Sequence, residues 1–403
     1  MNSRERVMTT LSHIEPDKVP IDIGDNVTGI HITAYRNLID YLGIEDKHIR
    51  FSNFAGQTVS PCEELLERFE IDTRCLQPPL HAFPENYTPI VVDKYQGVYD
   101  GFGVFWGDSA EKNLEDIPYY NPIINPLSEM TTVQQIKEYD WPDGTNNRSL
   151  RGLREKARKL RESTSYAIVG SRSQGNIFEY TTWLFGFENA LRHLQRNPKL
   201  IIAAMEELEK FWTDYATSYL NEIKFGDEHY VDIVCLQGDL GGQAGPIMNP
   251  KKFYEPIIKP IEHRFAKKIH QLANVKINYH CCGSIAMFIP HFAEMGYDAV
   301  NPIQISARDM EPCSLKKRFG SLITFWGGVC DTQRTLPFGT PEEIRQEVKY
   351  NMECLMPGGG FIASNIHNIT AEVPPENIVA MFDAIRENRV YRRFNSKRIR
   401  KAK

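Results

Sequence analysis

The second half of the chain alternates short, almost wholly apolar segments with longer segments whose apolar residues recur every three or four positions. Residues Tyr230–Leu236 form a nearly unbroken apolar run, which is typical of a parallel strand buried on both faces. Segments 198–224 and 251–272 have the helical period. Further strands are predicted at 275–279, 298–301, 322–326 and 360–363, with helices at 284–295, 312–318, 341–354 and 375–387. Repeated strand–helix units of this kind indicate a parallel α/β sheet.

The first half is less regular but adds three strands, near residues 21, 72 and 167. Helices are predicted at 3–12, 32–42, 61–69, 147–163 and 177–195. Segment 90–107 alternates and is rich in Val, Tyr, Phe and Gly, so we expect a β-hairpin inserted after the second strand. Eight strands in all predict a closed (β/α)₈ TIM-type barrel rather than an open sheet. A G-x-G-x-x-G fingerprint after the first strand and a P-loop are both missing from the sequence, which argues against nucleotide-binding folds.

Composition narrows the function classes. The 403 residues are 41% apolar and carry a net charge of −5, so the chain can form a sizeable core and a general nucleic-acid role has no electrostatic support. We expect one domain over 1–390 and a solvated basic tail over 391–403. A signal peptide is not visible, and a run of eighteen apolar residues does not occur, so we predict a cytoplasmic protein without a membrane span. The eight cysteines are then expected to be thiols and not a disulfide framework.

The most unusual stretch is His280-Cys281-Cys282-Gly283, at the end of the predicted strand 275–279. In α/β barrels, ligands and metals bind at the carboxyl ends of strands. Imidazole and thiolate both suit zinc, so His280 and Cys282 are a candidate metal pair.

Other predicted strands also end in polar or glycine-rich clusters. These contribute Arg172, Gln174, Glu179, Asp239, Gln243, Asn301, Gln304, Cys330 and His367, and His31 lies near the start of helix 32–42. Each has an ordinary alternative: Asp239 as a cap, Glu179 as a helix N-terminal acid, Cys330 as a buried small residue, His367 as a loop hydrogen-bonder. Gln243, Asn301 and Gln304 are equally compatible with loop roles, and His31 with helix entry.

Six motifs follow one another in a recognisable order: Glu15–Pro20, Gly238–Gly241, His280–Ser284, Gly327–Gly328, Leu336–Glu343 and Pro374–Ile378. This set resembles the uroporphyrinogen decarboxylase superfamily, and within it the decarboxylase-like proteins of corrinoid-dependent methyl transfer. The resemblance implies a distorted barrel with its cleft at the carboxyl ends of the strands.

True uroporphyrinogen decarboxylases use N-terminal arginines to hold the substrate's carboxylates. The corresponding region here, 21–31, has no arginine before Arg36, and Asp22 and Asp25 are expected to repel such a substrate.

The methyltransferase branch binds zinc through H-x-C and a later cysteine. His280 and Cys282 match the first two ligands, but Gly358–Phe361 stands where the third is expected. Cys330 or His367 is expected to replace it. Cys281 is a weaker candidate, because its side chain should point away from that of Cys282 if the strand continues.

The resemblance therefore implies a methyltransferase that moves a methyl group to or from a corrinoid (cobalamin) protein, with zinc activating a thiol acceptor. The expected roles are: catalytic, Asp239 and Glu179; substrate-binding, Gln243, Asn301, Gln304 and His31; metal, His280, Cys282, Cys330 and His367. Expected partners are a small methyl donor or acceptor, a corrinoid protein and a second copy of the chain. The alternatives are a tetrapyrrole carboxy-lyase and a non-catalytic corrinoid or tetrapyrrole binder.

Overall fold

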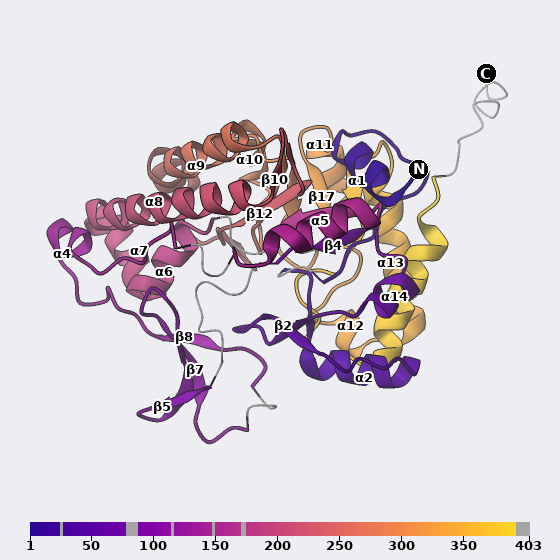
Figure 1. The fold of residues 1–403 in the computed structure, drawn as a ribbon, viewed down its shortest axis with the longest axis horizontal. Coiled ribbons are helices and arrows are strands. Elements are labelled where there is room, and N and C mark those ends of the chain that lie inside the picture. Colours follow the sequence, from indigo (N-terminus) through magenta and orange to yellow (C-terminus); the bar gives the residue numbers. More distant parts are fainter. Residues whose placement is uncertain (25–26, 78–87, 114–116, 147–149, 171–174, 392–403) are drawn as a thin grey trace.

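The protein is built on one curled parallel sheet, seen in a computed structural model that describes residues 1–24, 27–77, 88–113, 117–146, 150–170 and 175–391 (Figure 1). Seven parallel strands of these residues form it, in the order β18-β17-β16-β15-β12-β9-β4. They are β4 (Thr73–Cys75), β9 (Ala167–Gly170), β12 (Ile233–Gln237), β15 (Lys276–His280), β16 (Ala299–Asn301), β17 (Thr324–Trp326) and β18 (Phe361–Ile362). The sequence predicted each of them. The predicted basic tail lies outside the described residues, apart from residue 391.

The eighth position of the barrel holds an extended segment instead of a regular strand. Ile21 makes an isolated parallel bridge with Ala363, just beyond β18. On its other side, the Ile21 carbonyl accepts a hydrogen bond of 2.8 Å from the Asp72 amide, next to β4. The chain around Ile21 therefore joins the two edges of the sheet. The predicted distorted TIM-type barrel is confirmed, with its first strand reduced to a short extended segment around Ile21.

Helix α1 (Ser3–Leu11) packs against the barrel strands. Its apolar side chains Val7 and Leu11 form a small core with inward-facing strand residues. The other members of this core are Ala167, Val169, Ile233, Cys235, Ala299, Trp326 and Ile362. Because these residues alternate along their strands, they belong to one face of the curled sheet. This small apolar core thus fills the barrel interior below the carboxyl ends of the strands.

The remaining helices pack around the sheet, with α8, α9 and α10 forming a layer on one side (Figure 1). They are α2 (Ile32–Leu42), α3 (Glu63–Arg68), α4 (Val133–Lys137), α5 (Leu153–Ser163), α6 (Phe178–Phe185), α7 (Phe187–Arg196), α8 (Pro198–Glu222), α9 (Lys259–Leu272), α10 (Ile289–Glu294), α11 (Pro312–Phe319), α12 (Thr335–Phe338), α13 (Pro341–Leu355) and α14 (Pro375–Asn388). The predicted helix 251–272 divides into a π-helix, Pro250–Ile258, and α9. Pro256 lies inside the π-helical part, where its missing N–H disfavours regular α-helical bonding.

An antiparallel four-stranded sheet follows β4 in the chain, where the sequence predicted a hairpin. Its strands are β5 (Ile90–Val92), β6 (Tyr95–Tyr99), β7 (Phe105–Ser109) and β8 (Asn121–Ile124). Asp100 ties it to the barrel, because its carboxylate accepts hydrogen bonds from the indole of Trp106 (2.7 Å) and from the hydroxyl of Tyr180 on α6 (2.5 Å).

Short strands form smaller antiparallel sheets. β1 (Ile30–His31), β3 (Thr58–Ser60) and β2 (Arg50–Asn53) make one, β10 (Lys224–Phe225) and β11 (Glu228–His229) a second, and β13 (Gly241–Gly242) and β14 (Gly245–Pro246) a third.

The cysteines differ from expectation at one place. Cys313 on α11 and Cys354 on α13 form a disulfide, so the prediction that all eight cysteines are thiols is wrong for this pair. The two lie 41 residues apart, and no local spacing marks them as partners. The other six cysteines keep their thiols, as the sequence predicted.

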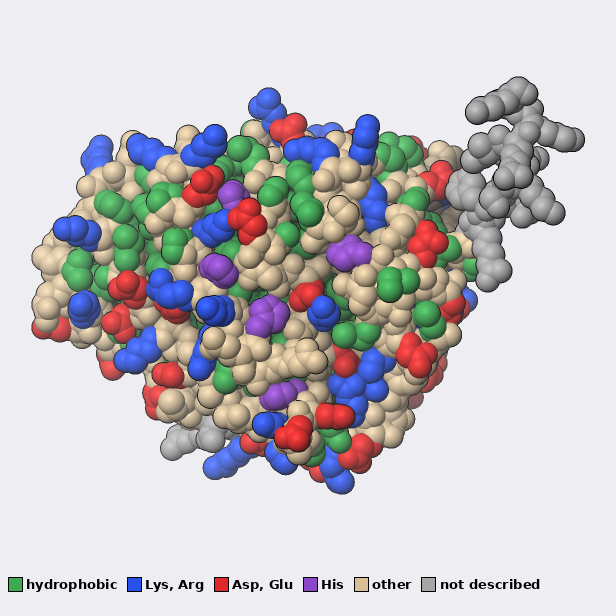
Figure 2. Space-filling view, turned by 90° about the horizontal axis from the view of Figure 1, so that it is seen from above, with side chains coloured by type: hydrophobic (Ala, Val, Ile, Leu, Met, Phe, Trp, Pro, Cys, Tyr) green, Lys and Arg blue, Asp and Glu red, His purple; other side chains and the backbone are tan. Residues whose placement is uncertain are grey.

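The surface carries acidic and basic side chains interspersed, as the face in Figure 2 shows. Within the described residues, no helix has the length and apolar character needed to cross a lipid bilayer.

Candidate metal centre

The candidate centre begins where three neighbouring strands end. His280 is the last residue of β15, and it pairs with Gln237 at the end of β12 and with Asn301 at the end of β16. The parallel register therefore places these three residues side by side at the carboxyl edge of the sheet. This is the edge where barrel enzymes assemble their sites.

Three metal-ligating side chains meet there: His280, Cys282 and His367. One nitrogen of each imidazole and the thiol sulfur all lie within 4.8 Å of one another. The sulfur of Cys282 is 3.2 Å from Nε2 of His280, and the two imidazole rings have centroids 5.3 Å apart. His367 has a φ of 60°, which is uncommon for a residue other than glycine and recurs at functional sites.

Both histidines are held neutral. Burial lowers the pKa of His280 to about 4, against an opposing hydrogen bond from Asn301. Burial, followed by repulsion from His280, lowers the pKa of His367 to about 4 as well. At neutral pH each ring therefore keeps a nitrogen lone pair, as metal ligation requires.

Cys282 is fixed through its backbone. Its amide donates to Oδ1 of Asp239 (2.8 Å), and the next amide, of Gly283, donates to Oε1 of Gln304 (2.7 Å). Gly283 has a φ of 82° and its α-carbon lies so close to Gly241 that a side chain would clash with that backbone. The tight turn aims the Cys282 thiol back toward His280.

Burial, reinforced by the nearby Asp239, raises the pKa of the Cys282 thiol well above its usual value. A bound cation would reverse this shift, because it stabilises the thiolate directly.

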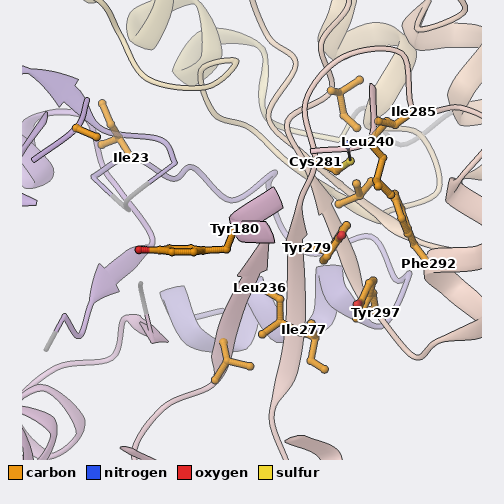
Figure 3. Packing of buried hydrophobic residues seen from close by; sticks show 14 of the residues in the cluster. Ile23, Tyr180, Leu236, Leu240, Ile277, Tyr279, Cys281, Ile285, Phe292 and Tyr297 are labelled. Carbon is orange, nitrogen blue, oxygen red and sulfur yellow. Dashed lines mark hydrogen bonds between the residues drawn. The ribbon is translucent and has the colours of Figure 1, made fainter. Parts of the chain in front are cut away.

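Cys281 points the other way, as strand alternation predicts. Its side chain is fully buried beside Leu240 and Ile285 in the apolar cluster of Figure 3. Its sulfur accepts a hydrogen bond from the Leu240 amide (3.3 Å). Cys281 is therefore a core residue.

Two carboxyl groups, Glu179 and Asp239, are half-buried beside the centre. Oε2 of Glu179 accepts hydrogen bonds from the side-chain amides of Asn176 (2.8 Å) and Gln237 (3.5 Å). Burial and then the charge of Asp239 raise the pKa of Glu179 well above its usual value, and burial also raises the pKa of Asp239. Burial and the neighbouring carboxylate therefore both favour the protonated form of Glu179.

The other residues predicted for the site lie in different surroundings. Cys330 is buried with its sulfur 3.8 Å from Oε2 of Glu347, outside the His280–Cys282–His367 group. Gln243 is exposed, and its side-chain amide donates to Oε1 of Gln333 (3.0 Å). His31 is buried at the N-cap of α2, where its Nδ1 accepts from the Thr33 amide. Arg172 and Gln174 lie outside the described residues.

Asn301 and Gln304 do lie at the centre, but behind the ligands. Asn301 is fully buried, with Oδ1 2.7 Å from Nδ1 of His280 and its amide nitrogen donating to the Trp326 carbonyl (3.2 Å). Asn176, the partner of Glu179, was not predicted. Its position three residues before Glu179 is the only signal in the sequence, and such a signal is too common to be selective.

The donor set fits zinc. One thiol and two neutral imidazoles are ligands that zinc prefers, and three protein ligands leave a fourth position open, as in catalytic zinc sites. A second group, Glu311 with Cys313 and Cys354, has its ligand atoms equally close together, but its two sulfurs are joined as the disulfide.

Residues 119–388, more than half of the chain, match the family model described as uroporphyrinogen decarboxylase (URO-D). The chain belongs to the URO-D family. The matched region contains β9 to β18, and with them all three candidate ligands. The URO-D family resemblance read from the motifs is thereby confirmed.

The fold is similar to that of a solved structure, a methyltransferase from Methanosarcina mazei. The TM-score is 0.64 at 17% identity, over 96% of this chain and 99% of that one. At this identity the likeness concerns the fold. No curated protein matches the chain.

Proposed function

We propose that this URO-D family member is a methyltransferase whose metal centre binds zinc through His280, Cys282 and His367. The observation that carries the proposal is the meeting of these three side chains within 4.8 Å at the carboxyl edge of the barrel. A decarboxylase of this family needs no metal, so a ligand set with zinc chemistry favours the methyl-transfer branch.

When bound, zinc would hold a substrate thiol as thiolate, the nucleophilic form that accepts a methyl group. The chain's own residues prepare this centre. Asn301 fixes the proton of His280 on Nδ1 and so leaves Nε2 free for the metal. Asp239 and Gln304 hold the Cys282 turn through two backbone amides.

Glu179 and Asp239 are proposed as the groups that accept and donate protons during methyl transfer. An acceptor thiol must lose a proton as it binds, and a leaving alkoxide or amine must gain one. Asp239 lies next to Cys282 and accepts its amide hydrogen bond, so it is placed near the entering group. Burial and then the charge of Asp239 raise the pKa of Glu179, which favours its protonated form and so suits it to donate.

The methyl group is proposed to travel to or from a corrinoid carried by a partner protein. Support comes from family membership, from the motif resemblance and from a structural neighbour that is itself a methyltransferase. The roles in substrate binding that the sequence suggested for Gln243 and His31 remain predictions. Cys330 is assigned no ligand role in this proposal.

A tetrapyrrole carboxy-lyase is the second candidate, since the family model carries that activity's name. The expected repulsion of its substrate by Asp22 is one argument against this activity, and the structure weakens that argument. Asp22 is fully buried and accepts hydrogen bonds from Thr28 (3.0 Å) and Trp326 (2.9 Å), so its carboxylate does not meet a substrate directly. Asp25 lies outside the described residues.

The test is demethylation of methylcobalamin by a panel of small thiols. The reaction is monitored through the change in corrinoid absorption. We expect zinc-dependent turnover that Cys282→Ala abolishes and Cys330→Ala retains, since Cys330 is a buried cysteine outside the ligand group. Zinc-dependent demethylation of an aryl methyl ether with cob(I)alamin would support the same centre working in the other direction. Release of CO₂ from uroporphyrinogen by chelator-treated protein, without methyl transfer, would overturn the proposal. Pigment binding without either reaction would favour a non-catalytic binder.

A further inference from the structure

The disulfide between Cys313 and Cys354 lies outside the metal centre, in the helical layer. It joins the N-terminal turn of α11 to the last turn of α13. Both helices belong to the outer shell of the barrel, and α11 packs along α13. The bond therefore fastens two neighbouring βα units to one another.

The two sulfurs differ in access. Cys313 is exposed, whereas Cys354 is buried. Cys313 is the second residue of α11, at the outer end of the junction. The exposed residue, Cys313, is therefore the side from which a small thiol approaches the bond.

Glu311 completes the junction. Its carboxylate accepts hydrogen bonds from the amides of Cys313 (3.0 Å) and Ser314 (2.6 Å), and it also accepts one from the hydroxyl of Tyr350 on α13 (3.1 Å). These contacts keep the two helices adjacent when the sulfurs are not bonded, so the disulfide can reform.

Helix α13 also holds a loop at the carboxyl edge of the barrel. Two residues on the same side of the helix as Cys354 make the contacts: Asn351 donates to the Val329 carbonyl (3.0 Å), and Glu347 accepts from the Asp331 amide (3.0 Å). The loop in turn reaches the metal centre, because the hydroxyl of Thr332 donates to the carbonyl of Ile366 (2.8 Å). Ile366 immediately precedes the ligand His367.

We propose that Cys313 and Cys354 are a reversible thiol–disulfide site, and that the state of this site controls how firmly α13 holds the loop 329–332 beside His367. The reductant is a low-molecular-weight thiol. Its thiolate attacks the Cys313 sulfur, the S–S bond breaks, and the Cys354 sulfur leaves with the electron pair and takes up a proton. A second thiolate then attacks the mixed disulfide, which releases the Cys313 thiolate and the disulfide of the reductant. Oxidation is the reverse, with a small-molecule disulfide as the oxidant.

The first part of the test counts thiols in the full-length protein, equilibrated over a range of ratios of oxidised to reduced glutathione. The samples are quenched in acid, then denatured and alkylated with a chelator present, because Glu311 and the freed cysteines together could retain metal. We expect six labels per chain at oxidising ratios and eight at reducing ratios, with Cys313 and Cys354 as the peptides that change. Cys313→Ser should give seven labels throughout, and the control Cys62→Ser should give five changing to seven. Eight labels at every ratio would overturn the proposal.

The second part measures amide hydrogen exchange in the oxidised and reduced proteins. We expect the amides of residues 329–332 and 366–368 to exchange about threefold or more faster after reduction, since the loop is held through α13. Cys313→Ser should match the reduced protein under both conditions. Reversible disulfide formation with no change in these amides would refute control of the loop. Neither part depends on methyl transfer, so the outcome is independent of the proposed function.

Discussion

Nδ1 of His280 lies 2.7 Å from Oδ1 of Asn301, and the two residues end adjacent strands of the barrel. The amide nitrogen of Asn301 donates to the Trp326 carbonyl, so its oxygen faces the imidazole. An amide oxygen only accepts, and therefore the imidazole proton resides on Nδ1. Nε2 is left with its lone pair, 3.2 Å from the Cys282 sulfur. A buried hydrogen bond thus sets the tautomer that the proposed metal centre needs.

Replacing Asn301 by Ala should weaken metal binding while the three ligands stay in place. Loss of such a hydrogen bond to a metal-ligating histidine costs about 10–100-fold in affinity. The measurement is competition for zinc with a chromophoric chelator. Asn388→Ala, which removes an amide at the far end of α14, is the control and should bind zinc like the parent protein. Equal affinities for the two variants would show that Asn301 does not act on the ligand.

The metal-free protein should lose stability as pH falls from 6.5 toward 4. His280 has a pKa of about 4 in the fold and an ordinary value of 6.5, so the unfolded chain takes up a proton first in this window. The loss approaches about 3 kcal/mol for His280 alone, which is 5% exposed. Urea denaturation at a series of pH values measures it. His280→Gln should make the profile above pH 4.5 less steep, with the share of His367 remaining, and an unchanged profile would contradict the buried neutral state.

Glu262 should make stability fall as pH rises. This buried carboxyl accepts a hydrogen bond from the Tyr279 hydroxyl (3.1 Å), and burial raises its pKa from 4.5 to about 8. The unfolded chain releases its proton near 4.5, so folding binds a proton between those two values. Glu262→Gln should therefore gain free energy of unfolding relative to the parent between pH 5 and pH 8, by about 3 kcal/mol at pH 7. Glu209→Gln, in a partly exposed pair with Arg264, should show no such trend.

Asp22 should be essential to barrel closure. Its buried carboxylate accepts from Thr73 of β4 (2.5 Å) and from Trp326 of β17 (2.9 Å), and so ties the first segment to both sides of the sheet. Asp22→Ala leaves these donors unpaired and should cost about 3 kcal/mol in the free energy of unfolding. Asp40→Ala, at an exposed position on α2, is the control. A cost below about 0.5 kcal/mol, the usual range for surface changes, would show that closure does not rest on this residue.

Much of this architecture could be predicted, because an unbroken apolar run indicates a strand that is buried on both faces of a parallel sheet. The run Tyr230–Leu236 and the segment before His280 carry that signal, and both became strands with polar residues at their ends. The alternation of side chains along a strand also predicted that Cys281 and Cys282 point in opposite directions. The segment near Ile21 was harder, because its bonds to Ala363 and Asp72 depend on residues far along the chain.

Long-range partnership explains the remaining differences. The sequence around Cys330 does not indicate that Glu347 lies beside its sulfur. Likewise, His367 lies near His280 only because the sheet closes. The roles of Asn301 and Gln304 behind the ligands likewise follow from strand register and not from sequence spacing. The pairing of Cys313 with Cys354 has the same origin, in the packing of α11 on α13.

The central claim is tested most directly by the metal that the centre binds and by the ligands it uses. The chelator-treated protein, with its disulfide intact, is titrated with Co²⁺ as a spectroscopic substitute for Zn²⁺, beside the Cys282→Ala, His367→Ala and Cys330→Ala variants. We predict one tetrahedral site per chain with a thiolate-to-cobalt charge-transfer band. The band should vanish in Cys282→Ala, the site should weaken in His367→Ala, and Cys330→Ala should be unaffected. A parent protein that binds no cobalt or zinc, or one whose charge-transfer band survives Cys282→Ala, would contradict the account.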